Sequence, residues 1–106
     1  MVKTVNESSF KTEVIDGVGK VVVDMYADWC GPCKMMAPII EELSERMEDI
    51  KFCKLNVDTA PGVTAQFRVM SIPTFLFFKD GVLVGSVIGV EEEEELEAEI
   101  RKVLGK

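Results

Sequence analysis

The stretch Trp29-Cys-Gly-Pro-Cys33 follows an apolar run, Lys20-Val-Val-Val-Asp-Met-Tyr26, and precedes residues 34–47, which have helical spacing. Because the run is apolar at almost every position, it predicts a central strand that is covered on both faces. Cys30 then lies where this strand gives way to the first turn of a helix. Proline is tolerated in a first turn, where its missing N–H would have no intrahelical partner.

The two thiols of this stretch, Cys30 and Cys33, lie one helical turn apart. Unpaired N–H groups and the helix dipole favour a thiolate at a helix N-terminus. A thiolate is the attacking species in disulfide exchange. We therefore predict that Cys30, the more accessible of the two, is the nucleophile and that Cys33 resolves the mixed disulfide. The alternative is a pair of buried, inert cysteines, but two thiols that flank Gly-Pro at a helix start have no packing rationale.

Length, composition and charge limit the number of domains, the kinds of partner and the compartment that we expect for this protein. With 106 residues, 47% hydrophobic and 29% charged, we expect one globular domain over residues 1–106. The net charge of −7 argues against nucleic acid or an anionic membrane surface as a partner. We find no apolar run that would span a membrane and no apolar signal segment after Met1, so we expect a cytoplasmic protein. Structural disulfides are rare in that reducing compartment.

The absence of histidine excludes Cys–His catalysis and imidazole metal ligands. Three cysteines also fall short of the four ligands that structural zinc usually takes. We therefore expect no metal, although a site shared between chains or completed by an oxygen ligand stays open.

Periodicity and turn signals divide the chain into strands and helices. We expect strands at 3–6, 21–26, 51–57, 74–79 and 82–88, and helices at 7–15, 31–47, 63–67 and 91–104. Asn6 or Ser8 caps the first helix, and Asp80-Gly81 is a strong hairpin signal between the last two strands. We interpret Met35 and Met36 as core residues of the 31–47 helix, with the alternative of some exposure near the cysteines left open. Pro38 predicts a kink in this helix.

The full string Trp-Cys-Gly-Pro-Cys-Lys after an apolar strand closely resembles thioredoxin, and the resemblance covers nearly the whole chain. It implies the α/β thioredoxin fold, a mixed central β-sheet with helices on both faces. It implies reduction of protein disulfides through a Cys30–Cys33 dithiol and a mixed disulfide, with recycling by a thioredoxin reductase. No cofactor would bind, because the electrons travel through the two sulfurs. We expect a monomer.

Asp24 is the second informative residue, because a carboxylate within an apolar strand is expensive to bury ionised. The simple alternative is that the strand is exposed to solvent at this position. By resemblance, Asp24 matches the family's buried aspartate beneath the resolving cysteine, which would accept the proton of Cys33. Lys54 matches the lysine that accompanies that aspartate electrostatically, although a lysine often just reaches water.

The resemblance also implies a substrate surface. Ile72-Pro73 matches the family's cis-proline loop, where Ile72 would offer its backbone to an extended substrate segment. Gly89 matches a glycine that lets a partner approach closely, although it could equally be a strand-end turn. Trp29 is expected beside the thiols rather than in the core. The apolar, uncharged surface is completed by Gly31, Pro32 and Val90.

The chain departs from the family's pattern near this surface. Tyr26 stands where many members have a second tryptophan, and Arg68, Met70 and Ser71 replace smaller or differently charged residues. These positions bear on partner preference and not on the chemistry. Cys53 lies outside the motif, in a core strand, and we expect it to pack as a small hydrophobe.

Two rival functions stay open at this point. A disulfide oxidase or isomerase commonly has a histidine between its cysteines, and this chain has Gly31-Pro32 there. A binding module would use the apolar surface and not the thiols. Replacing both cysteines with serine separates the last possibility from a redox role.

Overall fold

The computed structural model describes residues 1–105 as a five-stranded mixed sheet with helices on both faces. The strands lie in the order β1-β3-β2-β4-β5. β1 and β2 both run parallel to β3, whereas β4 is antiparallel to β2 and β5 is antiparallel to β4. The elements are β1 (Val2–Val5), η1 (Lys11–Ile15), β2 (Lys20–Tyr26), α1 (Gly31–Arg46), β3 (Ile50–Asn56), η2 (Val57–Thr59), α2 (Pro61–Gln66), β4 (Thr74–Lys79), β5 (Val82–Ile88) and α3 (Glu93–Leu104).

β2 is the central strand, as its continuous apolar run predicts. It pairs with β3 on one side and β4 on the other, and Val21 to Met25 are all buried. Successive side chains of a strand point to opposite faces, so a strand covered on both sides is apolar at consecutive positions. Asp24 is the one charged side chain in this buried run.

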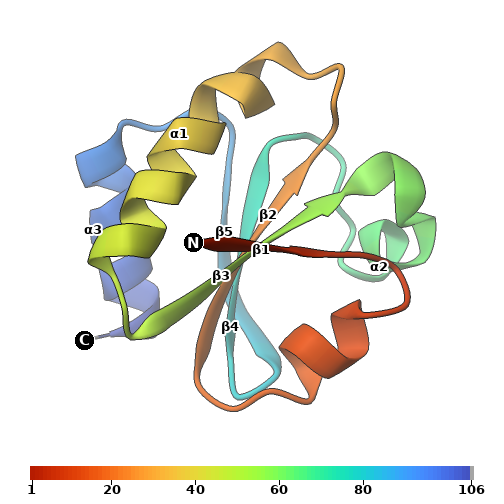
Figure 1. Cartoon of the computed structure of the whole chain (residues 1–106), viewed down its shortest axis with the longest axis horizontal. Helices are drawn as coiled ribbons and strands as arrows, with labels where there is room; N and C mark the ends of the chain where they lie inside the picture. Colours follow the sequence, from red (N-terminus) through yellow and green to blue (C-terminus); the bar gives the residue numbers. More distant parts are fainter. Residues whose placement is uncertain (106) are drawn as a thin grey trace.

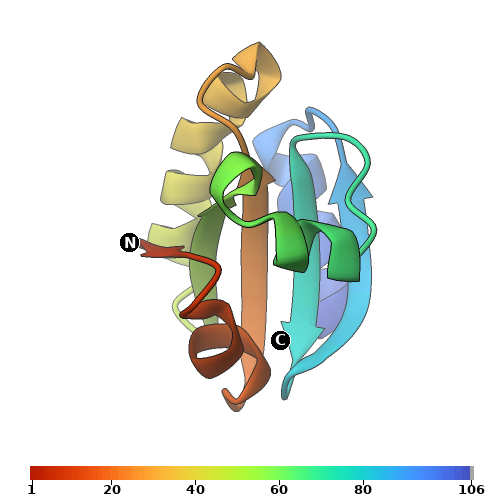
Figure 2. The ribbon, with the colours of Figure 1, turned by 90° about the vertical axis from the view of Figure 1, so that its right-hand side faces the viewer.

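The helices form one layer on each side of the sheet. In Figure 1, α1 and α3 lie on the left of the sheet, and α2 with the short helix η1 lies on the right. Figure 2 is the view from that right-hand side, with α2 and η1 in front of the strands. Each face has its own apolar core: Val22, Phe75 and Phe77 pack on the α1 and α3 side, and Val23, Leu76 and Phe78 on the other.

α1 buries one face and begins at the redox motif. Its buried side chains include Met36, Ile40 and Leu43, as the predicted stripe requires, and Met47 caps its C-terminal end. Met35 is 62% exposed, so its placement in the core is wrong. The position one residue before Met36 is turned about 100° around the helix, away from the sheet.

The predicted helix at 7–15 is shorter than expected. The chain forms a turn over residues 7–9, and a single helical turn follows in η1. Asn6 is not the cap of η1, whose N-cap residue is Phe10 and has no side-chain cap bond. The Oδ1 of Asn6 instead accepts the N–H groups of Ser8 and Ser9 at 3.0 and 2.9 Å and closes the preceding turn. The β4–β5 hairpin has its predicted bounds, and α3 begins two residues later than predicted.

Among residues 1–105, no helix has both the length and the apolar character needed to cross a membrane.

Candidate active site

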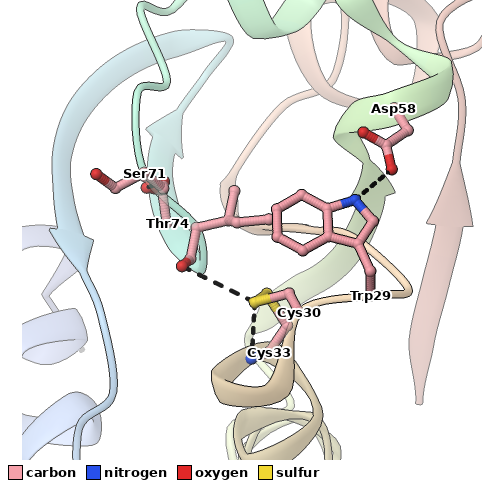
Figure 3. Close-up of a disulfide and its surroundings, with 7 residues drawn as sticks. Trp29, Cys30, Cys33, Asp58, Ser71 and Thr74 are labelled. Carbon is pink, nitrogen blue, oxygen red and sulfur yellow. Dashed lines mark hydrogen bonds between the residues drawn. A yellow bond between two sulfur atoms is a disulfide. The ribbon is translucent and has the colours of Figure 1, made fainter.

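The paired cysteines lie at the N-terminus of α1, joined in a disulfide (Figure 3). Cys30 is the N-cap residue in an extended conformation, and its Sγ accepts the N–H of Cys33 at 3.1 Å. The Cα atoms lie 5.2 Å apart, within the range that a disulfide spans. Pro32 falls in the first turn, where a missing N–H leaves no helical bond unmade. An N–H donated to Cys30 Sγ stabilises negative charge on that sulfur.

The two cysteines are equally buried in this disulfide form. Cys30 is 3% exposed and Cys33 is 4% exposed, so the expected greater accessibility of Cys30 is not observed here. Their neighbours distinguish them instead. Cys30 Sγ lies 3.9 Å from the carbonyl oxygen of Ile72, whereas Cys33 lines a cavity with Asp24. A sulfur in a disulfide carries no proton, so the approach to Ile72 is a contact and not a hydrogen bond.

Trp29 lies beside the disulfide and is 70% exposed, which excludes the core alternative. Its indole Nε1–H donates to Asp58 Oδ2 at 2.8 Å, and Figure 3 shows this bond reaching from the ring to η2. The bond ties one edge of the ring to η2, while most of the Trp29 surface stays open to solvent. Sequence reasoning did not single out Asp58, and no local pattern would have done so, because the two residues are 29 positions apart.

The loop before β4 lies against Cys30, and the segment after β5 is hydrogen-bonded to that loop. The Ile72–Pro73 peptide is cis, and the N–H of Gly89 donates to the Pro73 carbonyl at 2.8 Å. Gly89 has φ +94°, a conformation that favours glycine, and a side chain there would meet no atom within 4 Å. Gly89 is therefore required by its own backbone conformation and leaves open space beside the loop.

The predicted surface residues divide into exposed and covered positions. Gly31, Pro32 and Val90 are exposed, Ile72 is half-buried and Pro73 is buried. The exposed members carry no charge, and they come from the start of α1 and from the segment after β5. Gly31 and Pro32 thus place two exposed, uncharged residues beside the disulfide at the start of α1.

Asp24 is 5% exposed and lines a cavity of about 160 Å³ together with Cys33 and Lys54. None of the described residues donates a hydrogen bond to its Oδ1. Burial raises the pKa of the Asp24 carboxyl to about 7, and the positive charge of Lys54 opposes this rise. The alternative that the strand surfaces at Asp24 is therefore wrong. Asp24, with a pKa near neutral pH, therefore lines the same cavity as Cys33.

Lys54 lies in β3 directly opposite Asp24 in the register with β2. Neighbouring residues of a sheet pair point to the same face, and Lys54 accordingly lines the same cavity. The residue is half-buried rather than fully exposed.

Cys53 is fully buried, as expected, and packs in the core on the η1 and α2 side of the sheet. Burial raises the pKa of its thiol, which disfavours the reactive thiolate. In residues 1–105, no group of three or more potential metal-ligating side chains comes together.

Comparisons with known proteins agree with this geometry. The family model described as Thioredoxin matches residues 1–102. The chain is 46% identical over 102 residues to Thioredoxin from Alicyclobacillus acidocaldarius, covering 95% of this chain and 96% of the relative. It is 45% identical over 103 residues to Thioredoxin from Listeria monocytogenes, covering 96% and 98%. It is also 45% identical to the chloroplastic M-type thioredoxin of spinach, covering 97% of this chain and 58% of that one. The chain thus belongs to the thioredoxin family and is a disulfide oxidoreductase, a dithiol electron carrier with a redox-active Cys30–Cys33 pair.

Proposed function

We propose that this protein reduces disulfide bonds in protein substrates through a mixed disulfide at Cys30. The Cys30 thiolate attacks one substrate sulfur, forms a new S–S bond and releases the other sulfur as a thiolate. The Cys33 thiol then loses its proton and attacks Cys30 Sγ, which releases the second substrate thiolate. The substrate gains two electrons and two protons as two thiols, and the protein is left with the Cys30–Cys33 disulfide.

The observation that carries this proposal is the pairing of the two cysteines at the start of α1. The N–H of Cys33 points at Cys30 Sγ, and the helix N-terminus adds its partial positive charge. Both effects favour the thiolate of Cys30 over its thiol. No N–H group of residues 1–105 donates to Cys33 Sγ, and Cys33 lines the cavity with Asp24, which supports its role as the resolving thiol.

We propose Asp24 as the base that accepts the proton of Cys33. Both groups line one cavity, and a carboxyl with a pKa of about 7 is matched to proton transfer near neutral pH. Lys54 holds a positive charge in the same cavity and stabilises the ionised carboxylate that must be present before the transfer. These two residues therefore act in the second step and not in the first.

We propose that substrates dock on the uncharged surface around the disulfide. Its members are Trp29, Gly31, Pro32, Ile72, Pro73, Gly89 and Val90. The half-buried Ile72, whose carbonyl lies against Cys30 Sγ, is placed to pair its backbone with an extended substrate segment. A thioredoxin reductase would regenerate the dithiol at the same disulfide. The electrons pass through the two sulfurs without a cofactor, and the site is complete within one chain, which supports action as a monomer. We place this activity in the cytoplasm, where thiols are kept reduced.

The test is the reduction of a protein disulfide with dithiothreitol as the electron source, and then with a thioredoxin reductase and its electron donor. The wild-type protein should accelerate reduction in both cases. A Cys30→Ser/Cys33→Ser double variant should accelerate neither. If the wild-type protein accelerates neither reaction, while the double variant binds the same partners as the wild type, the protein is a binding module and the proposal is wrong.

A further inference from the structure

A groove along α2 adjoins the candidate substrate surface. It has a volume of about 610 Å³ and runs between α2 and the segment that leads to Ile72. A smaller cavity of about 160 Å³ lies between this groove and Trp29. The two share four lining residues, Val57, Thr64, Val69 and Met70. The groove therefore continues the surface around Cys30 rather than forming a separate site.

Arg68 lines the groove but not the smaller cavity. It directly follows Phe67, the residue that ends α2, and has φ +54°. Its N–H donates to the Ala65 carbonyl at 3.1 Å, the kind of bond that closes a helix end. Glycine is the residue that this left-handed conformation favours, because it has no Cβ. The backbone at this position thus gives no reason for an arginine.

Within residues 1–105, the Arg68 side chain has no ionic partner of its own. It is exposed, and no carboxylate of residues 1–105 lies within 4.0 Å of its guanidinium. Asp58 is the acidic residue of the groove wall, and its carboxylate accepts the indole N–H of Trp29. The helix dipole favours a cation near a helix C-terminus. A cation on a neighbouring residue with ordinary backbone angles would gain the same effect, so the dipole does not explain an arginine at this left-handed position.

The rest of the groove is mainly apolar. Met70 is 91% exposed, which is unusual for a methionine side chain, and Val57 and Val69 are partly buried behind it. Methionine adapts its shape to different apolar partners. The groove therefore combines an adaptable apolar wall with a guanidinium that none of the carboxylates described in the structure pairs with.

From this arrangement we infer that the α2 groove binds the substrate chain beside the reacting cysteine, with an apolar side chain against Met70 and a carboxylate on Arg68. The inference rests on the proposed reduction of protein disulfides and specifies the class of segment that is preferred. Guanidinium and carboxylate form paired hydrogen bonds, so the match selects acidic side chains over amides of the same shape. The preference acts on binding and leaves the sulfur chemistry unchanged.

The test uses symmetric disulfides of single-cysteine peptides, so that attack on either sulfur gives the same products. Every peptide carries leucine beside the cysteine, and a series places one glutamate, glutamine or lysine at successive positions on either side. Reduction by the dithiol form is followed at low salt by quenched flow with alkylation of the released thiols. For at least one position, kcat/KM for the glutamate peptide should exceed that for glutamine by about threefold to fivefold, the scale of an exposed ion pair.

Arg68→Glu should reverse this order, so that the lysine peptide becomes the better substrate. Lys79→Glu is the matched control, because it changes the net charge equally at the opposite end of β4 from Thr74. Arg68→Gly should abolish the preference while keeping the backbone conformation. Two results would overturn the inference about the groove but leave the proposed function standing. One is equal rates for all peptides with the wild-type protein, and the other is the same change in peptide preference in Lys79→Glu as in Arg68→Glu. Failure to reduce any peptide would overturn the proposed function as well.

Discussion

Replacing Asp24 with asparagine should stabilise the protein at neutral pH. The carboxyl is buried, its pKa is raised from the ordinary 3.8 to about 7 by burial, and its Oδ1 has no hydrogen-bond donor among the described residues. Between these two pKa values the native state binds more protons than the unfolded state. The free energy of unfolding therefore falls as pH rises from about 4 to about 7, and it levels off above that window.

The magnitude follows from the difference between the two pKa values. Their separation is about 7 − 3.8, or roughly three, and each pKa unit corresponds to about 1.4 kcal/mol. The charged carboxylate therefore costs up to about 4 kcal/mol near pH 7 and above. Asparagine keeps the shape without the charge, so Asp24→Asn should gain up to this amount at pH 7. The gain should vanish near pH 4, where the native aspartate is protonated.

The assay is urea unfolding of both proteins at pH 4 and pH 7, beside turnover with a protein disulfide. The variant should also turn over more slowly, because Cys33 loses its proton acceptor. Asp28→Asn is the control, since Asp28 is an exposed carboxylate on the same cavity and should change stability by less than about 0.5 kcal/mol. An Asp24→Asn variant that is equally stabilised at both pH values, or destabilised at pH 7, would refute the reasoning.

Three further predictions concern single positions. Limited alkylation of the reduced protein at neutral pH should label Cys30 first and Cys53 last, because Cys30 Sγ accepts an N–H at a helix start and Cys53 is fully buried. Peptide mapping that finds Cys53 labelled first would contradict this order. Glu7→Ala should lower the free energy of unfolding by about 1 kcal/mol, because the Glu7 carboxylate accepts two backbone N–H groups at the start of α2; an unchanged urea midpoint would show that this cap contributes nothing. Gly81→Ala should be more destabilising than Gly19→Ala, because both glycines have positive φ but only at Gly81 would a Cβ collide with a backbone carbonyl. An equal fall in the melting temperature of the two variants would rule out the collision.

Local sequence signals predicted the elements that carry the site. The Asp80-Gly81 pair fixed the hairpin because a two-residue turn of this type allows few alternatives, and both flanking strands have the predicted bounds. The apolar run of β2 and the proline in the first turn of α1 placed Cys30 at the helix N-terminus. The position of the cysteine pair at the start of a helix could therefore be predicted from a few consecutive residues.

Contacts between distant segments were not predictable in the same way. Glu7 was expected to be ordinary helix, but its carboxylate bonds to the start of α2, 55 and 56 residues away. Asp58 was expected in a turn, and its bond to Trp29 depends on how the fold brings η2 next to the segment before α1. Met35 was misplaced because it was grouped with Met36, although it lies about 100° around the helix from the buried stripe of Met36, Ile40 and Leu43.

The measurement that tests the central claim most directly is a trapping experiment with a Cys33→Ser variant. Without the resolving thiol, the mixed disulfide has no intramolecular route to release, so the variant should accumulate a covalent adduct with a protein disulfide substrate. Mass spectrometry of the digested adduct should find the substrate cysteine bonded to Cys30, and adding a dithiol should release it. No adduct, or an adduct bonded to Cys53, would contradict the account.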